Sequence, residues 1–190
     1  MKLTLLISIM LAGSMMVAAP VPAEENLAFI EQVGDSHHAQ IEQEGQGHET
    51  QIKQFGREHE ARVLQGGEEN RAEVTQEGLA NTLEIEQSGV SNQVSSFQEG
   101  QDNQLYYYLN SGTGNQALMK QYGDDNRMEL LQQGDFNRAD LQQHGDGNTM
   151  APQQWGGFNE LIYIQEGSSL PALGIEQTGG AFIEIHQTND

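Results

Sequence analysis

The stretch Asn81-Thr82-Leu83-Glu84-Ile85-Glu86-Gln87-Ser88-Gly89 decides the fold. From Asn81 to Gln87 its odd-numbered positions hold amide or apolar side chains, whereas its even-numbered positions hold Thr or Glu. An alternation with period two places these two sets on opposite faces of a β-strand. Gly89 then lies in a four-residue piece, Ser88 to Ser91, that is typical of a turn because glycine tolerates positive φ.

Glycine recurs at this turn position along most of the chain. The step is eleven residues, except for two steps of twelve, and the positions are Gly34, Gly45, Gly56, Gly67, Gly78, Gly89, Gly100, Gly112, Gly123, Gly134, Gly145, Gly156, Gly167 and Gly179. A helix is disfavoured, because glycine at every eleventh position would break it. The repeat instead predicts an all-β chain, a β-solenoid built from short strand-turn arcs.

Amide side chains flank each turn glycine. Two residues before it the chain carries Gln32, Gln43, Gln54, Gln65, Gln76, Gln87, Gln98, Asn110, Gln121, Gln132, Gln143, Gln154, Gln165 and Gln177. Three residues after it the chain carries His37, His48, His59, Asn70, Asn81, Asn92, Asn103, Asn115, Asn126, Asn137, Asn148 and Asn159. These positions alternate with the inward apolar side chains Ile30, Ile41, Ile52, Val63, Val74, Ile85, Leu130 and Leu141. Buried amides without partners would be costly, so we expect them to stack into hydrogen-bonded ladders at the ~4.8 Å strand spacing.

Residues 1–23 differ from the repeats. They hold one charge, Lys2, a short apolar run and the ending Val21-Pro22-Ala23, which is typical of a secretory signal peptide cut after Ala23. A membrane anchor is the other interpretation, but the run is short and is interrupted by Gly13. The sequence thus predicts a signal peptide over 1–23, a repeat domain over 24–190 and no membrane-spanning segment in the exported chain.

The composition argues against several functions. The chain has 190 residues, no Cys and a net charge of −20, so disulfides and cysteine-ligated metals are excluded and binding to nucleic acid is disfavoured. Catalytic motifs such as G-x-S-x-G, H-E-x-x-H and the P-loop are missing. We therefore identify no catalytic, cofactor-binding or metal-binding residues and expect no enzyme and no cofactor.

Three local features have open interpretations. His37, His48 and His59 replace Asn in consecutive arcs, which favours a structural role over a metal or pH-sensing column. Tyr106-Tyr107-Tyr108 lies within the first twelve-residue step, with one extra residue between Asn103 and Asn110, which suggests a β-bulge with an outward tyrosine, and residues 170–177 carry the second insertion. Pro152 removes a backbone donor, so the arc from Asn148 to Gln154 is expected to be weak.

The motif Gln-x-Gly-x-x-Asn-x-Ala-x-Ile-x-Gln closely resembles the curlin repeat of curli subunits, which are secreted bacterial amyloid proteins. It is cleanest over residues 76–81 and 132–139 and extends over about 26–187. The resemblance implies two arcs per coil, about seven coils and a cross-β arrangement on assembly. It also implies a fibre subunit for biofilm matrix, adhesion and surface colonisation, with the chain itself, a second curlin subunit and secretion or chaperone factors as partners. Both the major and the nucleating subunit stay open as assignments.

Charged pairs do not decide how many arcs form one coil. Opposite charges can be matched either two arcs apart or three arcs apart. The pairs two arcs apart are Glu49/Arg71, Arg62/Glu84 and Arg138/Glu160, and those three arcs apart are Lys53/Glu86 and Arg127/Glu160. Two arcs per coil therefore follows from the resemblance and not from the charges.

The ends of the predicted stack carry no polar cap. The first strand begins at Asn26, directly after the expected cut, and the last reaches Gln187. Open strand edges invite pairing with another chain, so we expect head-to-tail growth into a homopolymer. The alternative is a secreted β-solenoid that stays monomeric and binds a cell-surface or matrix ligand through its acidic outer face.

Overall fold

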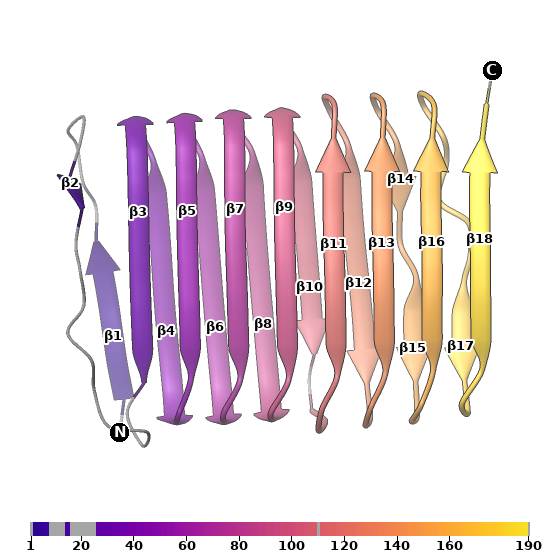
Figure 1. Ribbon diagram of the computed structural model, residues 1–190, viewed down its shortest axis with the longest axis horizontal. Helices are drawn as coiled ribbons and strands as arrows, with labels where there is room; N and C mark the ends of the chain where they lie inside the picture. The colour runs from indigo at the N-terminus through magenta and orange to yellow at the C-terminus, as the bar shows by residue number, and fades with distance from the viewer. Residues whose placement is uncertain (1, 8–13, 16–25, 110, 190) are drawn as a thin grey trace.

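The computed structural model describes residues 2–7, 14–15, 26–109 and 111–189. These residues form strands and turns, and among them there is no helix and hence none that could cross a membrane. Two sheets lie face to face, and the chain alternates between them with each successive arc (Figure 1). This arrangement confirms the predicted β-solenoid.

The sheet that contains β3 holds every other arc of the chain. Its strands are β3 (Leu27–Asp35), β5 (Glu49–Arg57), β7 (Arg71–Leu79), β9 (Gln93–Gln101), β11 (Gln116–Tyr122), β13 (Arg138–His144), β16 (Glu160–Glu166) and β18 (Phe182–Thr188). The sheet that contains β4 holds the remaining arcs. Its strands are β4 (His38–Gln46), β6 (Glu60–Glu68), β8 (Thr82–Val90), β10 (Gln104–Leu109), β12 (Arg127–Gln133), β14 (Thr149–Met150), β15 (Gln153–Trp155) and β17 (Glu176–Thr178).

Neighbouring repeat strands are parallel and in register. Ile41 lies opposite Val63, and Val63 lies opposite Ile85, so each strand pairs with the strand two arcs later in the chain. One coil therefore consists of two arcs, one in each sheet, as the resemblance implies. The ion pairs Arg62–Glu84, Arg71–Glu49 and Arg138–Glu160 all join residues one coil apart, at 2.7, 3.0 and 4.0 Å.

The core is a narrow layer between the two sheets. The side chains of Ile41, Ile52, Val63, Val74 and Ile85 are at most 1% exposed, and the flanking amides are equally enclosed. Along the repeat strands between the two ends, such as β7 and β8, buried positions alternate with half-exposed ones. The alternation with period two thus places apolar and amide side chains in the interior and acidic side chains on the exterior.

Most of the turn glycines lie where a side chain has no room, the exceptions being Gly156 and Gly179. All fourteen have positive φ, and at Gly67, whose φ is +104°, an added Cβ would lie 2.1 Å from the carbonyl oxygen of Gly89 in the next coil. Stacking of turn on turn therefore requires glycine sterically as well as conformationally. A second left-handed position lies two residues later and is often not glycine, as at Glu69, whose φ is +55°.

The predicted bulge at the tyrosines is wrong. Tyr107 is fully buried and Tyr106 and Tyr108 face outward, so β10 keeps its regular alternation. Leu109, not Asn110, lies opposite Gln87 and Gln132. Asn110 itself lies outside the described residues. The extra residue follows the strand, because a turn accommodates an insertion without reversing the faces of the strand.

The other two irregularities lie where the sequence places them. The arc from Asn148 is split into β14 and β15, with Pro152 between them, as expected from its missing N–H. In the last arc of the β4 sheet, Leu170 takes the corner position, and its backbone N–H donates to Asn148 Oδ1 at 3.0 Å. The second insertion lies between Leu170 and β17.

Two N-terminal strands lie against the first coil. β1 (Lys2–Ile7) pairs antiparallel with β4, and β2 (Ser14–Met15) pairs antiparallel with β3. All repeat strands, in contrast, pair in parallel. The expected cut after Ala23 lies outside the described residues, so the signal peptide stays a prediction.

Candidate functional site: the amide columns and their ends

Glutamine side chains form a column along the inner face of each sheet. In both columns the Nε2 of one glutamine donates to the Oε1 of the glutamine in the following coil, at 2.7 to 3.0 Å. The column of the β3 sheet consists of Gln32, Gln54, Gln76, Gln98, Gln121, Gln143, Gln165 and Gln187. The column of the β4 sheet consists of Gln43, Gln65, Gln87, Gln132, Gln154 and Gln177. We call these the glutamine columns.

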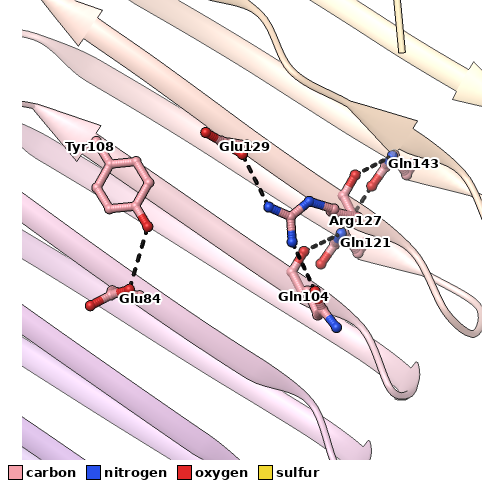
Figure 2. A network of polar contacts seen from close by, with 7 residues as sticks. All are labelled: Glu84, Gln104, Tyr108, Gln121, Arg127, Glu129 and Gln143. Carbon is pink, nitrogen blue, oxygen red and sulfur yellow. Dashed lines mark hydrogen bonds and ion pairs between the residues drawn. The ribbon is translucent and has the colours of Figure 1, made fainter. Parts of the chain in front are cut away.

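The same amides also join the two sheets. Gln121 Nε2 donates to the backbone oxygen of Gln104 in the opposite sheet, and Gln143 Nε2 donates to that of Arg127, both at 3.0 Å (Figure 2). The carbonyl fixes which end of each amide carries the hydrogens, because only nitrogen can donate to it. Every ladder bond therefore runs in one direction, from Nε2 of the earlier coil to Oε1 of the later coil.

Asparagine side chains form a second pair of columns at the turns. Asn70 is representative: its Oδ1 accepts the backbone N–H of Asn92 at 3.0 Å, and its Nδ2 donates to the backbone oxygen of Gly89 at 3.0 Å. Its Nδ2 also donates to the backbone oxygen of Gly66 at 2.9 Å, so the asparagine closes its own turn and holds the turn of the next coil. These corner columns end at the C-terminal side in Leu170 and Ala181, whose N–H groups bond to Asn148 and Asn159.

Three histidines take the asparagine role in the first coils. The Nδ1 of His48 accepts the backbone N–H of Asn70 at 3.2 Å, and its Nε2 lies 3.2 Å from the backbone oxygen of Glu44. His59 makes the equivalent contacts to Asn81 and Phe55, and its ring stacks on that of His37 at 5.1 Å. This geometry requires the neutral ring with hydrogen on Nε2. Burial accordingly lowers the pKa of both His48 and His59.

These histidines have no geometry that favours a metal. Both nitrogens of His48 and of His59 already have backbone partners, so a metal would have to break a bond that holds a turn. Within the ranges that the structure describes, no three His, Asp or Glu side chains lie together in a way that could hold an ion.

The outer face of the β4 sheet carries a polar network around Arg127. Its guanidinium donates to Gln104 Oε1 at 2.9 Å and to Glu129 at 3.2 Å (Figure 2). It also lies 4.7 Å from the centre of the Tyr106 ring. Tyr108 donates to Glu84 at 3.4 Å, and burial together with that carboxylate raises the pKa of Tyr108. The network therefore links neighbouring coils along the outer face of the sheet.

The glutamine column of the β4 sheet is interrupted once. Leu109 stands where a glutamine would be, so Gln87 Nε2 has no partner among the described residues. On the other side of the gap, the hydroxyl of Tyr107 donates to Gln132 Oε1 at 2.7 Å. The column residue lies six positions after the corner asparagine in the other coils, and this rule applied to Asn103 identifies Leu109 from the sequence. The rule used instead, two positions before the turn glycine Gly112, selected Asn110.

At the N-terminal end, both glutamine columns finish in an acceptor without a donor. Gln32 Oε1 and Gln43 Oε1 are enclosed, and in the described part of the chain neither has a hydrogen-bond partner. The corresponding glutamines at the other end are Gln177 and Gln187, whose Nε2 atoms donate only to backbone oxygens. The two ends of the solenoid are therefore complementary in hydrogen bonding.

The family model of the curlin associated repeat matches three parts of the chain, residues 23–45, 49–78 and 123–151. The chain contains curlin repeats. Comparison of this curlin-repeat protein with curated proteins gives no match. Both insertions lie outside the matched ranges, in keeping with their effect on the eleven-residue period.

Proposed function

We propose that this curlin-repeat protein is a secreted subunit of an extracellular amyloid fibre of the curli type, with a structural and not a catalytic role. The observation that carries the proposal is the state of the glutamine columns, which end in enclosed acceptors at Gln32 and Gln43 and, at Gln177 and Gln187, in amide nitrogens that donate to backbone oxygens and to no following glutamine. In the described chain β1 and β2 lie against this end, and removal of residues 1–23 would open both acceptors to another chain. A second copy supplies the missing donors.

The strand edges support the same function. After removal of residues 1–23, β3 and β4 expose unpaired backbone groups on one side of the stack, as β17 and β18 do on the other. An open parallel edge is a template for another strand. We therefore expect the exported chain to add copies end to end and to contribute to biofilm matrix, adhesion and surface colonisation. Another curlin subunit and secretion or chaperone factors are its expected partners.

Polymerisation with self-seeding tests this function. The full chain is expressed for export, the exported form is purified without denaturant, and thioflavin-T fluorescence is followed with and without sonicated seeds. We expect a lag that seeds abolish, together with filaments in electron micrographs. A monomer that persists at high concentration and ignores seeds would contradict the proposal and favour a solenoid that binds a ligand through its acidic outer face.

A further inference from the structure

The two sheets of repeat strands differ in the number of arcs. In the part of the chain that the structure describes, the β3 sheet has eight strands apart from β2. The β4 sheet has seven apart from β1, with β14 and β15 counted as two halves of one arc. The repeat part of the chain thus starts and finishes in the same sheet, with β3 at one end and β18 at the other. The total number of arcs is odd.

An odd number of arcs restricts how a second copy can continue the stack. Successive arcs alternate between the sheets, and each lies half a strand spacing further along the axis. A strand that follows β18 must therefore lie over β17. If β3 of the next copy were placed over β18 instead, its β4 would stand two spacings above β17 and leave a gap one strand wide.

We propose that successive subunits of the fibre are related by a half turn about its axis, so that β3 of one copy pairs with β17 of the preceding copy and β4 pairs with β18. This inference rests on the proposed function and specifies the junction that self-assembly uses. It requires β1 and β2 to leave the first coil, as removal of residues 1–23 would achieve. The β3 sheet of one subunit then continues as the β4 sheet of the next.

The glutamine columns fix the register of this junction. Gln177 Nε2 of one copy donates to Gln32 Oε1 of the next, and Gln187 Nε2 donates to Gln43 Oε1. Each new bond keeps the direction of the ladder bonds within the chain, and each gives a donor to an amide oxygen that has none within the described chain. Because the columns have a direction, a C-terminal end fits only an N-terminal end.

The apolar positions agree with that register. With glutamine opposite glutamine, Ile175 meets Ile30, Ile185 meets Ile41, and Ile183 meets Ala39. On the C-terminal side Ile183 and Ile185 are only partly buried in the single chain, so the junction completes their burial. On the outer face the register brings His186 opposite Glu42. The corner columns do not continue, since Leu170 and Ala181 offer no side-chain oxygen.

Cysteine pairs on the outer face distinguish the half turn from the alternative. The chain has no native Cys. In the half-turn junction, residue 176 lies opposite residue 31, and residue 186 lies opposite residue 42, about 4.8 Å apart at Cα, which is within reach of a disulfide. In a junction without the half turn, residue 186 lies opposite residue 31, whereas residue 176 stands two strand spacings, about 9.6 Å, from residue 42 and is out of reach of a disulfide. The variants E31C/E176C and E42C/H186C therefore test the proposal, with E31C/H186C and E42C/E176C as matched controls.

The full chain of each variant is expressed for export, polymerised and oxidised, and covalent oligomers are separated on a denaturing gel. We expect ladders for the first two variants, at least ten-fold more intense than for the two controls. Filaments with ladders in E31C/H186C and not in the first two variants would overturn the half turn, and filaments without ladders in any variant would overturn the end-to-end junction itself. Failure of every variant and of the unmodified chain to form filaments would instead contradict the proposed function, and the junction with it.

Helical reconstruction from electron micrographs gives an independent test. Fifteen arcs at half of a ~4.8 Å spacing each predict a rise of about 36 Å per subunit, together with a rotation of about half a turn. Subunits related by translation alone, without rotation, would overturn the proposal. This measurement does not depend on any substitution.

Discussion

The hydroxyl of Tyr107 donates to Oε1 of Gln132 at 2.7 Å and takes the place of the glutamine that one coil lacks. Leu109 lies at the position in the column where the other coils have glutamine. Tyr107 is the buried residue two positions earlier, and its hydroxyl extends past Leu109 to Gln132. Burial raises the pKa of Tyr107, in keeping with a hydroxyl that stays protonated and donates. The column is thus repaired on one side of the gap only.

We expect Tyr107→Phe to destabilise the solenoid by about 1–3 kcal/mol, because Gln132 Oε1 is then buried without a donor. Leu109→Gln supplies a glutamine that can bond to both Gln87 and Gln132. In that background the same Tyr107→Phe change should cost less than about 1 kcal/mol. A double-mutant cycle from urea unfolding measures the difference, and equal costs in both backgrounds would contradict the substitution of Tyr107 for a ladder amide.

Adjacent glycines provide a matched test of turn stacking. Gly67→Ala places a Cβ 2.1 Å from the oxygen of Gly89 at a φ of +104°, and we expect a loss of about 3 kcal/mol or complete failure to fold. Gly66→Ala has only Ser88 Oγ near it, at 3.6 Å, and should change stability by less than about 1 kcal/mol. Thermal unfolding of the two variants checks this contrast. Similar losses for both would mean that strand propensity, and not contact between turns, explains the glycine.

The buried histidines predict a stability that falls in acid. The pKa values of His48 and His59 are lowered in the folded chain from the ordinary value of 6.5, so their contribution is complete above pH 6.5 and declines as the pH falls below it. The cause is the loss of Nδ1 as an acceptor for the N–H groups of Asn70 and Asn81. Hydrogen exchange at these two amides, corrected for the intrinsic rate, should quicken between pH 7 and pH 5.

Asparagine variants separate this effect from a general response to acid. His48→Asn combined with His59→Asn keeps an acceptor at both corners and should remove the pH dependence at those amides. His38→Asn, at an exposed position, should leave it unchanged. An identical pH response in the unmodified chain, the double variant and the His38→Asn variant would show that the buried rings are not the source of the pH dependence.

The high negative charge predicts slow assembly at low ionic strength. The chain carries a net −20, and the part after residue 23 loses only Lys2, so stacked copies bring like charges within a Debye length of ~8–10 Å. We expect shorter thioflavin-T lag times with added salt at constant pH, and shorter lag times at pH 5 than at pH 8 in the His48→Asn/His59→Asn variant. Lag times that respond to neither would exclude electrostatic repulsion as a brake.

The sequence predicts the period, the faces and the turns of this fold because each is a local property of the repeat. Gly67, Ile85 and Gln87 each have the environment expected from their place in the eleven-residue unit. The number of arcs per coil could not be derived, because outer charges such as those of Arg138 and Arg127 can be matched either two or three arcs apart. The structure realises the pairs that lie two arcs apart.

The features that the sequence did not reveal depend on contacts between coils. The cross-sheet bond from Gln121 to the backbone of Gln104 has no local signal, since it joins two sheets. The left-handed conformation of Glu69 and its equivalents is imposed by the stacked turns, despite the preference of such residues for negative φ. Leu109 was misplaced because the insertion after it was assigned to the strand and not to the turn.

The central claim is that the strand stack of one chain continues into the next. X-ray fibre diffraction from aligned filaments of the exported chain, grown without denaturant, tests this claim most directly. The account predicts a sharp meridional reflection at about 4.7–4.8 Å, since strands then repeat at that spacing along the whole fibre. Filaments without this reflection, or a β-rich monomer that forms no filaments, would contradict it.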